Sequence, residues 1–162
     1  VRGPVLDTIM QFITSLGDGG FLAILTCLVL LLAPRWRKVG LTASLSLALD
    51  YVFLNLILKN VVARVRPYVL LEGLQLITRE PSDYSFPSGH TGSAFAVASV
   101  LFLCMSPKAG IPAMILAALI AFSRLYLGAH FPTDVMGGAI IGCLTGVIAW
   151  KLVWKRKTGT VR

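Results

Sequence analysis

Long apolar blocks, separated by short polar connections, are the dominant pattern along the chain. Five such blocks cover residues 20–33, 41–58, 89–105, 111–127 and 133–154. A helix needs about 20 residues to cross the hydrocarbon core of a bilayer, with a lower limit near 17. The first block is short by this measure, and the other four are long enough with their flanking residues. The pattern predicts an all-α integral-membrane helical bundle with about five spanning helices.

The segment ahead of these blocks follows a different pattern. In residues 5–16, apolar side chains recur at the spacing of an α-helix and would form one face, with mostly polar side chains on the other. We expect an N-terminal amphipathic or partly inserted helix, which lies in the membrane interface or packs on the bundle. The glycine-rich residues 17–20 separate it from the first span.

The chain is predicted to form a single domain over residues 1–162. Residues 1–19 hold the amphipathic helix and its turn, residues 20–154 the transmembrane core, and residues 155–162 a polar tail. One connection, 59–88, is much longer than the others, and we expect residues 69–77 within it to form a short interfacial helix. Because long loops in compact domains are usually functional, this loop is the predicted active-site loop.

The composition agrees with a membrane protein and disfavours nucleic-acid binding. Apolar residues make up 56% of the chain, charged residues 14%, and the net charge is +8. The basic residues form no stripe interleaved with aromatic side chains, as a nucleic-acid-binding surface would need. We therefore expect no nucleic-acid partner.

The distribution of charge predicts the orientation in the membrane. With five spans, one side collects nine basic residues and no acidic one: Arg35, Arg37, Lys38, Lys108, Lys151, Lys155, Arg156, Lys157 and Arg162. The positive-inside rule makes that side cytoplasmic. The long loop then faces outward, so we expect a plasma (inner) membrane protein with its site on the extracytoplasmic side.

Three polar segments meet on the outward side. They are residues 59–67 at the end of the second block, residues 87–90 at the start of the third, and residues 123–134 between the fourth and the fifth. Hydropathy alone places all three at one membrane face. Lys59, Arg66 and Arg124 supply cations there, which are expensive near hydrocarbon and would repel one another without an anion. Arginine grips phosphate oxygens in pairs, and lysine adds a point charge.

A helix start and two histidines complete a possible phosphate site. Ser88 and Gly89 lie where a helix begins, and its free backbone N–H groups can bind an anion. Asp134 follows His130 by four residues, close enough to fix the histidine tautomer and leave one nitrogen as a nucleophile. His90 lies beside the predicted phosphate cradle, which we define as Lys59, Arg66, Arg124 and the helix start at Ser88 and Gly89. It suits a general acid.

Other interpretations apply to single residues. Each histidine alone is more often structural than catalytic, and Arg66 and Arg124 alone could be interface anchors. A metal site from His90, His130 and Asp134 is disfavoured, because three nearby cations would oppose a divalent ion. Asp50 lies mid-span, nine residues before Lys59, and ideal helical geometry turns it away from that lysine. Its expected role is a helix-packing or subunit contact and not catalysis.

The motifs KxxxxxxRP (59–67), PSGH (87–90) and SRxxxxxHxxxD (123–134) resemble those of the type 2 phosphatidic acid phosphatase superfamily. That family includes lipid phosphatases, undecaprenyl-diphosphate phosphatases and vanadium haloperoxidases. The resemblance implies metal-independent catalysis without a cofactor. It implies His130 as nucleophile, His90 as acid and Asp134 as the partner of His130, with phosphate bound by Lys59, Arg66, Ser88, Gly89 and Arg124.

The sequence therefore predicts a membrane phosphatase that acts on a lipid phosphate or diphosphate through a phosphohistidine. Undecaprenyl diphosphate is the first candidate substrate and phosphatidylglycerol phosphate the second. Two alternatives stay open: a phosphotransferase that passes the phosphoryl group to a lipid acceptor, and a non-enzymatic transporter of a phosphorylated solute. The oligomeric state does not follow from the sequence.

Overall fold

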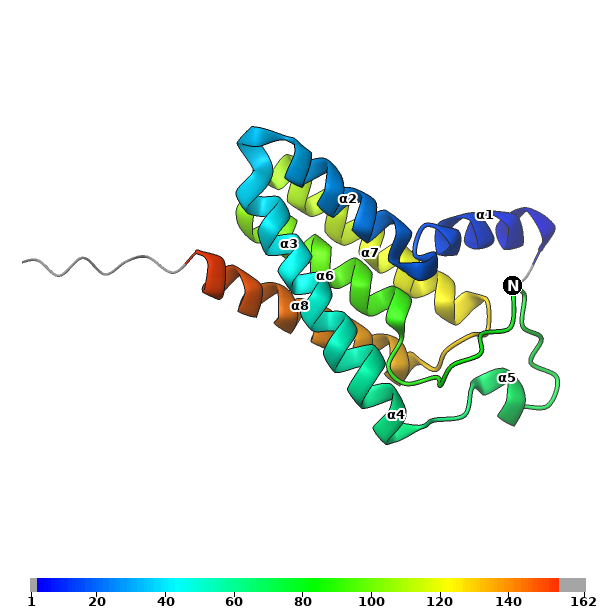
Figure 1. Ribbon diagram of the computed structural model, residues 1–162. Helices are drawn as coiled ribbons and strands as arrows, with labels where there is room; N and C mark the ends of the chain where they lie inside the picture. Colours follow the sequence, from blue (N-terminus) through cyan, green and yellow to red (C-terminus); the bar gives the residue numbers. More distant parts are fainter. Residues whose placement is uncertain (1–2, 155–162) are drawn as a thin grey trace, which may run out of the picture.

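The computed structural model describes residues 3–154, and these form an all-helical bundle (Figure 1). The α-helices are α1 (Pro4–Ser15), α2 (Phe21–Leu32), α3 (Arg37–Asp50), α4 (Lys59–Val62), α5 (Pro67–Leu70), α6 (Gly89–Cys104), α7 (Pro107–Tyr126) and α8 (Pro132–Val153). Short 3-10 turns, η1 (Asp18–Gly20) and η2 (Pro34–Trp36), flank α2. A π-helical stretch, η3 (Tyr51–Leu58), joins α3 to α4 in one continuous rod.

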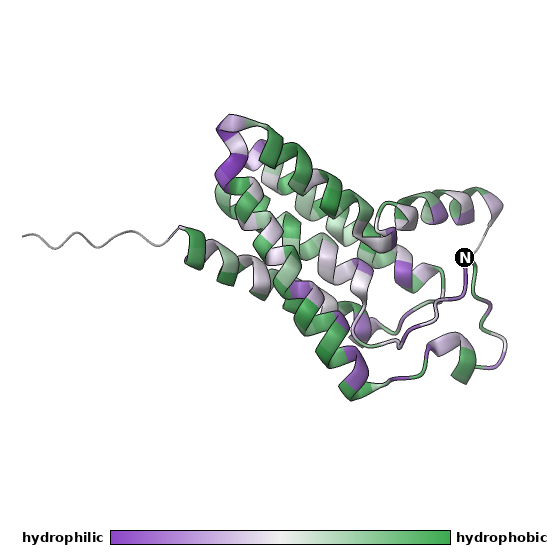
Figure 2. Ribbon diagram, in the orientation of Figure 1, coloured by the Kyte–Doolittle hydropathy of each residue, from purple (hydrophilic) through white to green (hydrophobic). Residues whose placement is uncertain are grey.

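The bundle is long and apolar enough to span a membrane. Within residues 3–154, four helical segments have the required length and hydropathy: Pro4–Leu32, Pro34–Leu70, Pro107–Tyr126 and Pro132–Val153. The shorter apolar helix α6 lies in the middle of the bundle (Figure 1). Figure 2 shows apolar residues along the helices, with hydrophilic ones gathered at the α2–α3 turn and around the loops at the opposite end. The predicted all-α membrane bundle is confirmed. Within residues 3–154 it has four candidate spans and the shorter apolar helix α6, where the sequence predicted about five spans.

Close packing of α8 on α6 sets the position of the site. A Cβ added at Gly142 of α8 would lie 2.4 Å from the carbonyl oxygen of Gly92 in α6. Gly138 and Gly146, one turn to either side, are equally crowded against α6, so only glycine allows this approach. The backbone N–H of Ser88, at the start of α6, donates to the carbonyl of Asp134, at the start of α8, over 3.0 Å. The amino-terminal ends of both helices therefore meet at one point.

Helix α1 packs against α7 and buries one apolar and one polar side chain, Met10 and Thr14. Thr14 is 3% exposed, whereas Val5 and Phe12 are 74% and 67% exposed on the outer face. The turn after it, η1, has Gly19 and Gly20 at φ values of 57° and 71°, a left-handed conformation that favours glycine. The predicted amphipathic helix is present as α1, with Val5 and Phe12 exposed on the surface of the bundle.

Two expectations from the sequence are wrong. The helix predicted for residues 69–77 is reduced to α5, which ends at Leu70, because Leu71 is extended (φ −105°, ψ 109°). Asp50 does not turn away from Lys59, since both residues line the same cavity. The π-helical stretch between them has wider turns than the ideal α-helix that the sequence argument assumed.

Candidate active site

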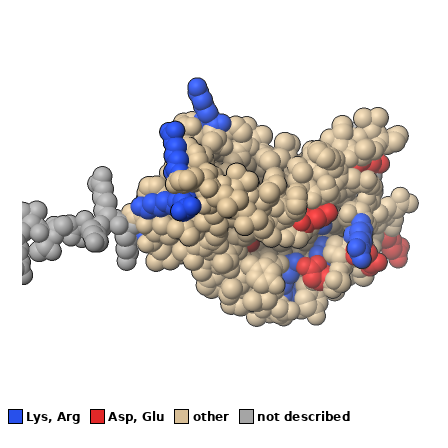
Figure 3. Space-filling view, turned by 45° about the horizontal axis from the view of Figure 1, so that its top comes forward, with Lys and Arg blue, Asp and Glu red and all other residues tan. Residues whose placement is uncertain are grey.

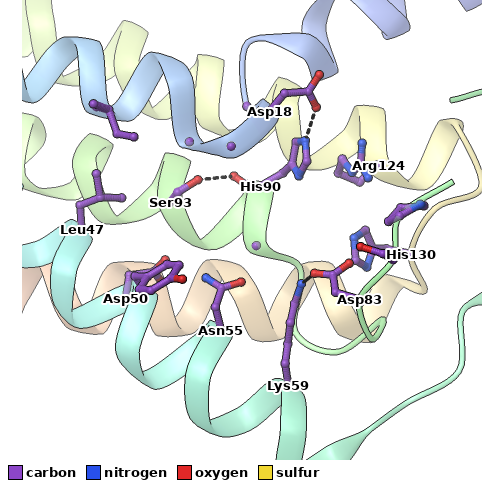
Figure 4. A pocket seen from close by; sticks show the side chains of 18 of the residues that line it. Asp18, Leu47, Asp50, Asn55, Lys59, Asp83, His90, Ser93, Arg124 and His130 are labelled. Carbon is purple, nitrogen blue, oxygen red and sulfur yellow. Dashed lines mark hydrogen bonds and ion pairs between the residues drawn. The ribbon is translucent and has the colours of Figure 1, made fainter. Parts of the chain in front are cut away.

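A cavity of about 960 Å³ lies at the loop end of the bundle and extends between α2 and α3. Side chains from η1, α2, α3, η3, α6 and α7 and from the loop 78–83 line it (Figure 4). Six of the eight residues that the sequence singled out line this cavity: Lys59, Arg66, Gly89, His90, Arg124 and His130. The other two, Ser88 and Asp134, are fully buried directly behind it.

His130 has its two ring nitrogens in different surroundings. Nδ1 lies 3.6 Å from Oδ2 of Asp134, which is ion-pair range but too long for a hydrogen bond. Nε2 lies 3.3 Å from Nη1 of Arg66, which can only donate. This arrangement suits the tautomer with its proton on Nδ1 and its lone pair on Nε2. The nitrogen that can attack an electrophile therefore faces the cavity.

Asp134 is held by three donors. Its Oδ1 accepts from Nη1 of Arg64 at 2.8 Å, and its Oδ2 accepts from Oγ of Ser85 at 2.5 Å and from the backbone N–H of Phe131 at 2.9 Å. The guanidinium of Arg64 also lies over the Phe131 ring, 4.1 Å from its centroid. The structure thus shows Arg64, which was not among the predicted site residues, as the ion-pair partner of Asp134.

Burial keeps His130 neutral. Removal from water, with help from the positive charges of Arg66 and Arg124 and against the opposing effect of Asp134, lowers the pKa of His130 to about 4. The imidazole is therefore unprotonated at neutral pH. A neutral imidazole with its free lone pair in the cavity is the form that a nucleophile requires.

Lys59 and Arg66 share the carboxylate of Asp83, a residue that the sequence analysis did not select. Nη2 of Arg66 lies 2.6 Å from Oδ1 of Asp83, and Nζ of Lys59 pairs with the other oxygen. Burial opposes ionisation of Asp83, but Lys59 and Arg66 outweigh it and hold the pKa of this carboxyl below its ordinary value. Both cations are 5% exposed. An anionic group thus occupies the cradle that was predicted to bind phosphate.

Arg124 faces the same cavity from α7 and keeps a donor free. Its Nη1 donates to Oγ1 of Thr14 in α1 at 2.6 Å. Its Nε is buried and has no hydrogen-bond partner within residues 3–154. A buried, unpaired N–H is costly, and a phosphate oxygen would satisfy it.

The start of α6 forms one wall of the phosphate cradle. The side chain of Ser88 caps the helix by accepting from the N–H and the hydroxyl of Thr91, so its hydroxyl is already engaged. A Cβ added at Gly89 would lie 3.2 Å from Oδ1 of Asn55 and 3.7 Å from Nζ of Lys59. The free N–H groups of this helix end suit an oxyanion. The phosphate-binding roles of Ser88 and Gly89 stay predictions.

His90 has a carboxylate partner from a distant part of the chain. Its Nε2 lies 2.7 Å from Oδ1 of Asp18 in the η1 turn (Figure 4). A Cβ added at Gly17 would lie 2.8 Å from Cδ2 of His90, so this glycine lets the turn reach the ring. No local spacing links residues 18 and 90, and sequence reasoning missed the pair. The turn after the N-terminal helix thus contributes to the site.

The site can bind a phosphoryl group and attack it, because it holds three cations, a helix amino terminus, a neutral imidazole and a second histidine. Within residues 3–154, no three His, Cys, Asp or Glu side chains come together as metal ligands.

Comparisons with known proteins agree with this geometry. The chain matches the PAP2 superfamily over residues 39–158. It is 35% identical over 138 residues to the undecaprenyl-diphosphatase of Sulfolobus acidocaldarius, covering 85% of this chain and 66% of that relative. The chain thus spans slightly less than two thirds of that protein's length.

Two crystal structures have a similar fold. Aquifex aeolicus LpxE superposes with a TM-score of 0.79 at 33% identity, covering 93% of this chain and 88% of that one. The PAP2-type phosphatidylglycerolphosphate phosphatase of Bacillus subtilis gives a TM-score of 0.77 at 30% identity, covering 100% and 82%. These matches confirm the resemblance predicted from the three motifs, and the prediction of a membrane-embedded phosphatase holds at the level of the family. The chain belongs to the PAP2 superfamily.

Proposed function

We propose that this protein is a membrane lipid phosphatase that hydrolyses a lipid phosphate or diphosphate through a phosphohistidine on His130. The observation that carries the proposal is the position of the Nε2 lone pair of His130, which faces a cavity lined by Lys59, Arg66 and Arg124. A nucleophile directed at a cluster of buried cations suits an anionic electrophile. The family and its phosphatase relatives support this interpretation.

The first step forms the phosphoenzyme. Nε2 of His130 attacks phosphorus, the bond from phosphorus to the lipid oxygen breaks, and His90 in its protonated form gives its proton to the departing oxygen. Asp134 stabilises the positive charge that develops on the His130 ring. The three cations and the N–H groups at the start of α6 stabilise the negative charge on the phosphoryl oxygens.

The second step releases phosphate. His90, now neutral, takes a proton from a water molecule as that water attacks phosphorus, and the N–P bond to His130 breaks. Inorganic phosphate leaves and both histidines return to their starting states. Asp18 orients His90 for both transfers, and no residue outside this chain is needed to balance the protons.

The charge distribution supports a site on the extracytoplasmic side of the plasma membrane. Figure 3 shows Lys and Arg gathered at one end of the molecule, whereas acidic and basic side chains are mixed at the other. The basic end holds Arg35, Arg37, Lys38, Lys108 and Lys151, and four further basic residues of the predicted cytoplasmic side lie outside residues 3–154. If the host is bacterial, the outer leaflet makes undecaprenyl diphosphate available first and phosphatidylglycerol phosphate second.

Phosphate release by the purified protein tests the activity. The substrates are undecaprenyl diphosphate, phosphatidylglycerol phosphate, phosphatidic acid and a soluble sugar phosphate. We expect release from at least one lipid, unaffected by a strong chelator and abolished in His130→Ala. Labelled lipid formed without free phosphate would indicate a phosphotransferase instead. Movement of a phosphorylated solute without cleavage would indicate a transporter.

Single-cysteine labelling tests the orientation. The background lacks Cys27, Cys104 and Cys143, and one cysteine is then introduced at Glu72 in the long loop or at Lys108 at the opposite end. An impermeant reagent should label the Glu72→Cys protein in intact cells and the Lys108→Cys protein only after lysis. The reverse pattern would place the site in the cytoplasm and remove the argument for outer-leaflet substrates.

A further inference from the structure

The buried carboxyl group of Asp50 is not used by the mechanism above. Asp50 is 1% exposed, and its Oδ1 atom has no hydrogen-bond partner within residues 3–154. It nevertheless lines the same cavity as Lys59 and His130. An ionisable side chain at membrane depth costs about 3 kcal/mol or more, and it is usually functional. A buried carboxyl oxygen without a hydrogen bond is costly, and a polar group that enters the cavity beside Asp50 could supply the missing partner.

Asp50 lies about one helical turn from the phosphate cradle. A Cβ added at Gly89 would contact Asn55 and Lys59, and a Cβ added at Gly92 would lie 2.8 Å from Oδ1 of Asp50. Gly89 and Gly92 are three residues apart, which is about 4.5 Å along α6. A lipid with its phosphate near Gly89 and its chains toward α2 and α3 would place the group that follows the phosphate near this carboxyl.

The π-helical stretch η3 brings these polar residues onto one face. Asn55 follows Asp50 by five residues, as the i→i+5 repeat of a π-helix requires, and Lys59 follows Asn55 by four. Figure 4 shows the three side chains along one side of the rod, facing α6. Ser93 of α6 lines the cavity at the same level. Asp50, Asn55 and Ser93 together form what we call the polar band.

Beyond the polar band the cavity becomes apolar. Its far part is lined mainly by Cys27, Leu28 and Leu31 of α2 and by Leu47 and Ala48 of α3. The cavity thus runs from a cationic cradle, through a short polar section, to a hydrocarbon section. A lipid bound along it would place its phosphate, its linking group and its chains in that order.

We infer that the polar band binds a hydroxyl-bearing linker, such as a glycerol or sugar unit, between the scissile phosphate and the chains of the substrate lipid. A hydroxyl both donates and accepts, so it pairs with Asp50 in either protonation state and with the amide of Asn55. This inference rests on the proposed phosphatase activity and names the class of lipid that it selects.

The same position suits an isoprenoid diphosphate poorly. Its hydrocarbon chain would leave the carboxyl unpaired, and its second phosphate would lie close to an acidic group. Availability in the outer leaflet makes undecaprenyl diphosphate the first candidate substrate. The lining of the cavity instead favours phosphatidylglycerol phosphate, because a glycerol with a free hydroxyl carries its scissile phosphate.

The test compares two substrates that differ in the linker. Phosphatidylglycerol phosphate and phosphatidic acid with the same acyl chains are assayed with the wild type and with Asp50→Leu and Asp50→Asn. Asp50→Leu should lower kcat/KM for phosphatidylglycerol phosphate by about tenfold relative to phosphatidic acid, because a hydrogen-bonded group is lost. Asp50→Asn keeps a polar group and should lose less. Hydrolysis of undecaprenyl diphosphate should be unchanged or faster in Asp50→Leu.

A matched control separates recognition from folding. Ser46 is buried on the same helix, bonds to the carbonyl of Ala96 and does not line the cavity, so Ser46→Ala should leave the ratio of the two substrates unchanged. An equal fall on all substrates in Asp50→Leu, or no change on any, would overturn the inference in favour of a packing role.

A binding measurement gives an answer that does not depend on turnover. In the His130→Ala background, Asp50→Leu should weaken the binding of short-chain phosphatidylglycerol phosphate by about tenfold and leave that of phosphatidic acid unchanged. If the wild type releases phosphate from no lipid, the proposed function fails while this comparison still decides the role of Asp50. Equal binding of phosphatidylglycerol phosphate with and without Asp50→Leu would refute the polar band.

Discussion

The carboxylate of Asp83 lies where the substrate phosphate is expected, and its removal gives a quantitative prediction. Asp83 pairs with both Lys59 and Arg66, and its side chain is 49% exposed. Exposed ion pairs contribute about 0.2–1 kcal/mol each, so we take roughly 1.4 kcal/mol for the two together. A phosphate or its analogue must displace them. Asp83→Asn should therefore strengthen inhibition by orthovanadate about tenfold, since tenfold corresponds to about 1.4 kcal/mol.

The assay is the inhibition constant of orthovanadate against phosphate release at fixed ionic strength. Glu80→Gln is the matched control, because Glu80 lines the cavity from the same loop and bonds only weakly, at 3.4 Å, to Tyr68. Asp83→Asn also keeps the backbone carbonyl that accepts from Nε of Arg66 at 2.9 Å. If Asp83→Asn binds vanadate no better than Glu80→Gln does, the carboxylate does not compete with phosphate, and this reasoning fails.

Two substitutions and one pH profile test the roles of the histidines and their partners. Arg64→Met should lower kcat about tenfold, since it removes the ion-pair partner of Asp134 and leaves only the donors of Ser85 and Phe131, and a normal rate would exclude this role. Asp18→Asn should slow lipid substrates about tenfold but spare p-nitrophenyl phosphate, whose leaving group needs no proton from His90. The pKa of about 4 for His130 predicts an acid limb of kcat/KM near that pH. An acid limb of kcat/KM centred near pH 6.5 would contradict the lowered pKa of His130.

The clustering of the three motifs could be predicted from hydropathy, because apolar blocks of spanning length fix which loops share a membrane face. Lys59, His90 and His130 come together as that argument requires. The partners Asp18 and Asp83 could not be predicted. Each reaches the site from a turn or loop, and no periodicity links it to the histidine or the cations that it contacts.

The orientation of Asp50 was predicted wrongly for a physical reason. At 100° per residue, nine residues place Asp50 and Lys59 on opposite faces of a helix. The stretch Tyr51–Leu58 is π-helical, and its wider turns bring both residues to one cavity. Nothing in its apolar sequence distinguishes a π-helix from an α-helix. A mid-span carboxyl was the available signal, since its cost near hydrocarbon favours a functional role over packing.

The central claim is that His130 carries the phosphoryl group. The most direct measurement is acid-quenched, mass-spectrometric detection of phosphohistidine after rapid mixing with a phosphorylated substrate. In His90→Ala with p-nitrophenyl phosphate, the account predicts a phosphoryl group on His130 that accumulates, because the water attack lacks its base. His130→Ala should carry none. A phosphoenzyme that persists in His130→Ala, or is found on another residue of the wild type, would contradict the account.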